Sequence, residues 1–265
     1  MDEIKKISRI EFEDIASKYS FPQEMLAKDY FLTVLLYLFK DVEGIYFKGG
    51  TAINKILLDH PRLSEDIDFS VTKEIAIIKK EICSIIEESE LFGEITEDKN
   101  VDGFVRIIVE YTGFATGKDK IFIDLNKRAS LLLKPEIHDV KHFYKPFVPS
   151  FSVKTIAKEE MIAEKVAATI GRNKPRDHFD VYNLIREGQS INLNLVKQKC
   201  AASGYEFSIL KMFNKAQTLK NRWDKDMVPL LAEPIPFQEV MKSLSKHFKL
   251  KEEKENIKKN NRSAS

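Results

Sequence analysis

Residue types that mark secreted or membrane-bound proteins are scarce in this sequence. Its 265 residues include only two cysteines, Cys83 and Cys200, whose positions give neither a disulfide framework nor metal-ligand spacing. The longest apolar run, residues 30–39, is shorter than the roughly 18 residues that cross a bilayer. The first residues lack the basic, apolar and small-residue segments of a signal peptide. From these absences we expect a cytoplasmic protein that does not bind membranes.

Net charge is also small. The formal net charge is +2, while 43% of the residues are hydrophobic and 32% are charged, which is typical of a soluble globular protein. This balance does not by itself indicate a nucleic-acid partner. Local basic groups either follow a phosphate backbone, with Phe213 and Trp223 stacking on bases, or are solvated helix faces. These groups are residues 118–120, 127–128, 172–176 and 211–225.

A pair of glycines stands between a predicted strand and a predicted helix. Residues 45–47 are β-branched or aromatic, and residues 51–59 have helical apolar spacing. Between them, Gly49 and Gly50 permit a sharp turn and a close approach of a ligand to the main chain. The following helix would offer unpaired N–H groups to a phosphate. The motif Lys48-Gly49-Gly50-Thr51 therefore predicts a phosphate-binding turn, although such a pair alone is more often an ordinary turn.

Acidic residues follow the turn at short range. Residues 67–71 predict a strand, so Asp66 and Asp68 project from one face with Cα atoms about 6–7 Å apart. Carboxylates in this arrangement can share Mg²⁺ with substrate phosphates. Asp124, in the strand-like run 121–125, supplies a third carboxylate. The alternatives are a solvated strand end and, for Ser64, a helix N-cap.

Five segments occur in an order typical of one enzyme family. They are Lys28-Asp29-Tyr30-Phe31-Leu32, Phe47-Lys48-Gly49-Gly50-Thr51-Ala52, Arg62-Leu63-Ser64-Glu65-Asp66-Ile67-Asp68-Phe69, Glu164-Lys165-Val166-Ala167-Ala168 and Arg176-Asp177-His178-Phe179-Asp180-Val181-Tyr182-Asn183-Leu184. Over residues 25–190 the chain resembles the AbiEii toxin family of nucleotidyltransferases, which belongs to the DNA polymerase β-like superfamily. The resemblance implies an α+β fold, with a mixed-sheet nucleotidyltransferase domain and a helical C-terminal domain that completes the cleft.

The resemblance also implies roles for individual residues. Asp66 and Asp68 would be catalytic and bind Mg²⁺, with Asp124 as the third metal ligand. Lys165 would contact the triphosphate or acceptor, and Asp180 would be a catalytic carboxylate on the next helix. The nucleoside triphosphate would be held by Gly49, Gly50, Thr51, Ser64 and Lys165.

Without the resemblance, the region around Lys165 predicts only a helical hairpin. Ser152 or Thr155 would cap a helix ending near Gly171, and a second helix would end near Gly188. In that interpretation Lys165 and its charged neighbours Arg172 and Asp180 form surface ion pairs that contribute little to stability.

The chain divides into three predicted parts. Residues 1–145 form the nucleotidyltransferase domain with N-terminal helices, whose buried stripe includes Phe31, Val34, Leu35 and Leu38. The proline-containing segment 146–150 ends this part. Residues 146–250 form the helical domain, and residues 251–265 form a basic tail expected to be disordered.

The resemblance implies the toxin of a type IV toxin–antitoxin pair. It would use Mg²⁺ to transfer a nucleotide from a nucleoside triphosphate to RNA, with the 3′ end of tRNA as the expected acceptor and a cognate antitoxin as a further partner. The alternatives are transfer to a small molecule or protein, and a nucleotide- or RNA-binding module without catalysis. Clustered carboxylates argue against the last, because a site without metal has no physical need for costly negative charges.

Overall fold

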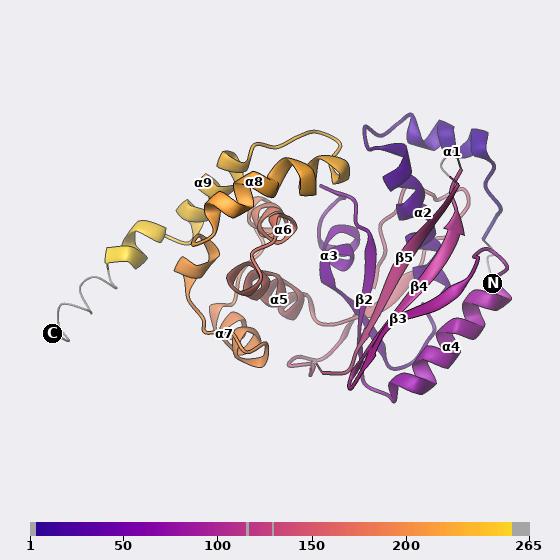
Figure 1. Cartoon of the computed structure of the whole chain (residues 1–265), viewed down its shortest axis with the longest axis horizontal. Coiled ribbons are helices and arrows are strands. Elements are labelled where there is room, and N and C mark those ends of the chain that lie inside the picture. The colour runs from indigo at the N-terminus through magenta and orange to yellow at the C-terminus, as the bar shows by residue number, and fades with distance from the viewer. Residues whose placement is uncertain (1–3, 115–116, 129, 256–265) are drawn as a thin grey trace. The chain divides into compact units, whose positions relative to one another are not determined.

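The structure is a computed structural model that describes residues 4–114, 117–128 and 130–255 (Figure 1). The chain forms two compact units. The first is Met1–Met161 with Pro229–Glu233, and the second is Ile162–Val228 with Pro234–Ser265. The segment 146–150 lies inside the first unit, because a strand after it joins the sheet.

Seven strands form one mixed sheet in the described part of the first unit, in the order β3-β4-β5-β2-β1-β7-β6. β2 pairs with β5 in parallel and with β1 in antiparallel fashion, and β1 also pairs in parallel with β7. The strands are β1 (Ile45–Lys48), β2 (Asp66–Val71), β3 (Ile95–Val101), β4 (Phe104–Thr112), β5 (Lys118–Asn126), β6 (Glu136–Asp139) and β7 (Ser152–Thr155). The predicted strands at 45–47, 67–71 and 121–125 are confirmed.

Two helices, α2 (Gln23–Leu38) and α4 (Ile75–Glu88), pack on the apolar face of this sheet. The ring of Phe31 in α2 lies 4.4 Å from that of Tyr111 in β4, measured between centroids. α4 contributes three buried isoleucines at helical spacing, Ile78, Ile82 and Ile86. Since side chains alternate along a strand, burial of this face leaves Asp66 and Asp68 on the opposite face of β2.

The predicted N-terminal stripe is more extensive than the sequence pattern indicates. Phe31, Val34 and Leu35 are buried as expected, whereas Leu38 is only partly buried. Most sides of α2 are buried because this helix packs against the sheet, against α4 and against the aromatic residues around Tyr144.

The second unit is helical in its described residues. α6 (Pro175–Arg186) packs against α8 (Ala216–Met227) and α9 (Phe237–His247). The Tyr182 hydroxyl of α6 donates to Glu239 of α9 at 2.6 Å. Gly188 follows α6 with a φ of +68°, which confirms the predicted end of this helix. Other helices among the described residues are α1 (Arg9–Ala16), α3 (Gly49–Ala52), the π-helix η1 (Ile53–Leu57), α5 (Lys158–Gly171), α7 (Leu193–Ala202), η2 (Ile209–Met212) and η3 (Val228–Leu230).

Three expectations are corrected. Ser152 and Thr155 do not cap a helix, because both lie in β7, and α5 begins only at Lys158. Trp223 is buried, with its indole N–H donating to the Ile235 carbonyl at 2.8 Å, so it is a core residue and not a stacking platform. Residues 251–255 are helical rather than disordered, and residues 256–265 lie outside the described part.

Helices long and apolar enough to span a membrane are absent from residues 4–114, 117–128 and 130–255.

Candidate active site

The glycine turn is in direct contact with one carboxylate of β2. Gly49 has a φ of +79°, a conformation that residues with a Cβ rarely adopt. A Cβ placed on Gly49 would lie 2.1 Å from Oδ2 of Asp68. Both the backbone conformation and the space therefore require glycine, and the turn holds the Asp68 carboxylate against the main chain.

Thr51 fixes the other side of the turn. Its side chain is buried, and its hydroxyl donates to the backbone carbonyl of Asp66. Three residues further along the chain, the side-chain amide of Asn54 donates to the Gly50 carbonyl at 2.8 Å. The Thr51 hydroxyl thus ties the turn to β2. Its expected role as a phosphate ligand stays a prediction.

The three predicted carboxylates lie on two neighbouring strands. Asp68 is the Cα partner of Asp124 across the parallel pair β2–β5, and Asp66 is the partner of Phe122. In-register residues of a sheet share a face, so Asp66, Asp68 and Asp124 project to the same side. On the other side of β2, Lys48 of β1 is the Cα partner of Asp68, so a basic residue lies next to the carboxylates.

Asp124 is held by an arginine that the sequence interpretation did not single out. Arg106 of β4 is its Cα partner in the antiparallel pair β4–β5. Nε and Nη2 of Arg106 donate to Oδ1 and Oδ2 of Asp124, each at 2.7 Å. This hydrogen bonding raises the pKa of Arg106 above its ordinary value, and the charge of Asp66 raises it further. Both oxygens of Asp124 are therefore engaged by one guanidinium.

Ser64 lies just before β2 in a buried polar contact. Nη1 of Arg62 donates to the Ser64 hydroxyl at 3.1 Å and to the Leu63 carbonyl at 2.9 Å, and both Arg62 and Ser64 are buried. Arg62 therefore holds the chain that leads into Asp66. Ser64 is not the N-cap of a helix.

The described residues contain no group of three His, Cys, Asp or Glu side chains placed to hold a metal ion. Asp124, the predicted third ligand, pairs with the guanidinium of Arg106. Asp66 and Asp68 still fit Mg²⁺, which is commonly bound by one or two carboxylates together with substrate phosphates.

A buried ion pair joins the helical segment after the glycine turn to α2. Lys55, in the π-helix that continues from α3, lies 2.7 Å from Oδ1 of Asp29 and donates to the Thr33 hydroxyl at 3.0 Å. The Tyr144 hydroxyl lies 3.2 Å from the second oxygen of Asp29. π-helical turns often occur at functional sites. The sequence signals for this pair were Lys55, four residues after Thr51, and Asp29 in the first family segment.

The second unit holds Lys165 in a buried charged cluster. Nζ of Lys165 lies 3.0 Å from Asp177 and 2.9 Å from Asp180, and the exposed fractions of the three residues are 5%, 1% and 0%. Arg172 also donates to Asp177, through Nε at 2.7 Å and Nη2 at 2.9 Å. The surface ion pairs of the helical-hairpin interpretation are therefore wrong for Lys165 and Asp180, although Arg172 is half exposed.

Asp177 is ionised in this cluster despite its burial. Desolvation by burial acts to raise the pKa of Asp177, but the charges of Lys165 and Arg172 and their hydrogen bonds hold it well below its usual range. The catalytic role expected for Lys165 and Asp180 stays a prediction, and the geometry adds that the two residues form a buried ion pair.

The family described as "Nucleotidyl transferase AbiEii toxin, Type IV TA system" matches residues 31–243. The chain belongs to the AbiEii family. It is accordingly a nucleotidyltransferase and a toxin of the type IV toxin–antitoxin class. None of the curated proteins matches it.

Two solved structures show the same fold. MenT4, a nucleotidyltransferase toxin from Mycobacterium tuberculosis H37Rv, is 20% identical with a TM-score of 0.67, over 92% of this chain and 89% of that one. JHP933 from Helicobacter pylori is 16% identical with a TM-score of 0.58, over 92% of this chain and 100% of that one. The predicted α+β fold with a mixed sheet and a helical C-terminal part is thereby confirmed.

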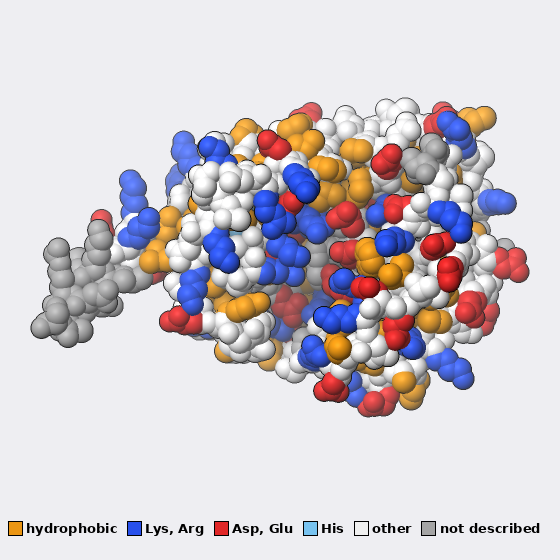
Figure 2. Space-filling model, viewed as in Figure 1, with side chains coloured by type: hydrophobic (Ala, Val, Ile, Leu, Met, Phe, Trp, Pro, Cys, Tyr) orange, Lys and Arg blue, Asp and Glu red, His pale blue; other side chains and the backbone are white. Residues whose placement is uncertain are grey.

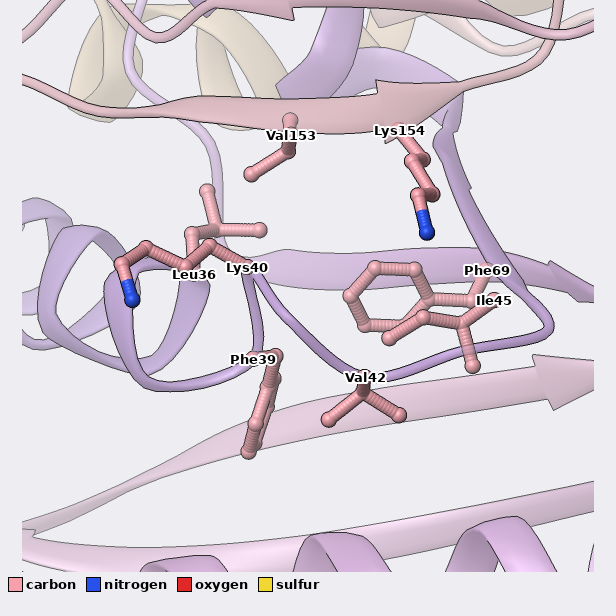
Figure 3. Close-up of a pocket in the computed structure, with 8 residues that line it drawn as sticks. All are labelled: Leu36, Phe39, Lys40, Val42, Ile45, Phe69, Val153 and Lys154. Carbon is pink, nitrogen blue, oxygen red and sulfur yellow. The ribbon is translucent and has the colours of Figure 1, made fainter.

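One cavity of this AbiEii member lies on the opposite side of the sheet from the carboxylates. Figure 3 shows Phe69 of β2 among its lining residues, and Phe69 alternates with Asp68 along the strand. Its volume of about 10 Å³ is the size of a single water molecule, so it does not accommodate a nucleotide. Its lining is completed by Leu36, Phe39, Lys40, Val42, Ile45, Val153 and Lys154.

Proposed function

We propose that this toxin transfers a nucleotide from a nucleoside triphosphate to RNA in a Mg²⁺-dependent reaction, with the 3′ end of tRNA as acceptor. The observation that carries the proposal is the position of Asp68. It is packed against the Gly49 turn on one side and is the register neighbour of Asp124 on the other. We infer that the phosphate-binding turn and the metal-binding carboxylates meet at this residue.

Asp66 and Asp68 are the residues we assign to Mg²⁺. They project from the same face of β2, and neither belongs to the buried apolar layer. When bound, Mg²⁺ neutralises charge on the α-phosphate and lowers the pKa of the acceptor hydroxyl. The protein contributes fixed carboxylate positions, because Thr51 holds the Asp66 main chain and Gly49 fixes the space around Asp68.

The main chain of Gly49 and Gly50 is the part of the turn that we assign to the triphosphate. Both glycines are partly exposed, and the absence of side chains lets phosphate oxygens approach backbone N–H groups. Thr51 and Ser64 are buried and engaged by protein partners, so we assign them to shaping the nucleotide site.

Basic residues of the second unit support RNA as the acceptor. Figure 2 shows Lys and Arg side chains gathered over α5 and α6. In the predicted basic segment 172–176, Arg172 and Lys174 are exposed and Arg176 is partly exposed. Such a group can neutralise phosphates without reading sequence. We further propose a cytoplasmic location, where nucleoside triphosphates and tRNA are available, and a cognate antitoxin as partner.

The proposal is tested by incubating the purified chain with each α-³²P-labelled nucleoside triphosphate, Mg²⁺ and total RNA. We expect label in RNA of tRNA size, lost with EDTA and in Asp66→Asn or Asp68→Asn. Each substitution keeps the side-chain volume but removes the charge that holds the metal, so both variants should keep the melting temperature. Label in a small molecule or in protein would replace RNA as acceptor, and near-normal turnover of either variant would refute the metal assignment.

A further inference from the structure

We propose that Arg106 is an internal counter-ion for Asp124, which a divalent cation displaces when it binds beside Asp66 and Asp68. This inference rests on the proposed function, because it concerns the same metal site. It assigns to Arg106 a positioning role: the arginine sets how tightly the site binds metal in the absence of nucleotide.

In the sheet, Arg106 and Asp68 lie on the two sides of Asp124. Arg106 is the Cα partner of Asp124 on β4, and Asp68 is its Cα partner on β2. The Asp124 carboxylate is therefore placed between a guanidinium and the metal-binding strand. Both of its oxygens are turned to Arg106, at 2.7 Å each.

Charge explains why a counter-ion is needed there. Three carboxylates on adjacent positions of one sheet face repel one another when no cation is present, and repulsion of this kind is costly in a partly desolvated site. Arg106 neutralises one of the three charges through its two parallel hydrogen bonds to Asp124. A divalent cation supplies more positive charge at the same place, so it can take over Asp124.

The surroundings permit Arg106 to move while Asp124 stays. The Arg106 side chain is 34% exposed, whereas that of Asp124 is 12% exposed. The guanidinium carbon lies 5.3 Å from the ring centroid of Phe122, the residue beside Asp66 in the register. Phe122 thus offers a flat surface over which the guanidinium can shift toward solvent.

The test measures Mn²⁺ binding to the full chain without nucleotide, by the electron paramagnetic resonance signal of free Mn²⁺. We expect Arg106→Gln to bind Mn²⁺ about tenfold more tightly or better, since removing a positive charge a few ångströms away is worth at least this factor. Lys99→Gln is the matched control, because Lys99 is the neighbour of Arg106 on β3 and is exposed. It removes the same charge one strand further from Asp124, and we expect a change of less than about twofold.

A double variant separates competition for Asp124 from general electrostatics. If Arg106 and the metal compete for this carboxylate, the gain of Arg106→Gln disappears in the Asp124→Asn background. A gain that persists there, or no gain in Arg106→Gln, overturns the proposal. Arg106→Lys keeps the charge but loses the paired hydrogen bonds, so it should bind Mn²⁺ more tightly than wild type. This comparison stays available if Arg106→Gln is too unstable to measure. Failure of the proposed function looks different: Mn²⁺ binding would then not depend on Asp66 or Asp68 in any background.

Discussion

Gly49 and Asp68 approach so closely that no other residue fits at position 49: a Cβ there would lie 2.1 Å from the Asp68 carboxylate oxygen. The contact joins the turn and the strand that together form the candidate nucleotide and metal site. It also provides a direct test of that site.

Gly49→Ala should abolish Mg²⁺-dependent transfer and lower stability. The new Cβ pushes the Asp68 carboxylate away, and a residue with a Cβ at positive φ costs about 1–2 kcal/mol in addition. Gly188→Ala is the matched control, since Gly188 has a φ of +68° with nothing within 4 Å of an added Cβ. It should lose stability by a similar strain term and keep full transfer. Equal activities of the two variants would show that the Gly49–Asp68 contact has no role in the reaction.

Lys55→Met should destabilise the first unit by about 3–5 kcal/mol, because it leaves the buried charge of Asp29 without its cation. Adding Asp29→Asn should recover part of this loss, which urea unfolding of the single and double variants would measure. Strict additivity of the two changes would mean that the ion pair contributes nothing as a pair.

Lys165→Met should likewise cost about 3–5 kcal/mol, since Asp177 and Asp180 would remain buried with less compensation. Asp177→Asn in the same chain should restore part of the stability. Transfer per folded molecule of this double variant then decides the role of Lys165. Return of activity would limit the lysine to folding, whereas a loss on the order of 10²–10³ would support its predicted contact with the triphosphate or acceptor.

Stability should fall on mild acidification because two histidines are buried in their neutral form. Burial, together with the charge of Lys55, lowers the pKa of both His60 and His142 to about 4. In the unfolded chain their pKa is about 6.5, so between these values the unfolded state binds more protons. The stabilisation from the two neutral histidines should therefore be fully present above about pH 6.5. It should decline toward pH 4, by up to about 3 kcal/mol for each histidine.

Denaturation of the wild type and of His60→Asn at pH 7 and pH 5 measures this effect. Asn suits the positive φ of His60, which is 50°. The variant should show a smaller loss between the two pH values, and an unchanged loss would remove His60 from the account.

Local patterns predicted the elements that carry the site. The glycine turn, the strand with Asp66 and Asp68, and the strand with Asp124 follow from short runs of residues whose periodicity is clear. The strand Ser152–Thr155 was missed because it has four residues, follows a proline-containing segment and exists only through its pairing with β1 and β6. Its identity depends on residues about 100 positions away in the chain, a distance that periodicity does not report.

The partners of the charged residues could not be predicted for a similar reason. That Arg106 pairs with Asp124 follows from the register of β4 on β5, which a sequence does not state. Lys165 looked like a surface residue because lysine is seldom buried, and its burial depends on two carboxylates supplied by α6. Trp223 was misassigned because basic neighbours suggested a surface, while its ring is in the core of the helical unit.

The charged cluster around Lys165 bears on how inactive variants of this toxin would be found genetically. Cells that survive expression of a mutagenised gene are selected for low total activity, which falls equally when the protein is degraded. Changes at Lys165, Asp177 and Asp180 would be recovered among such survivors through reduced protein level, because each one leaves a buried charge uncompensated. Survivors altered at Asp66 or Asp68 would instead accumulate the toxin at normal abundance, so an immunoblot would distinguish the two groups where survival does not.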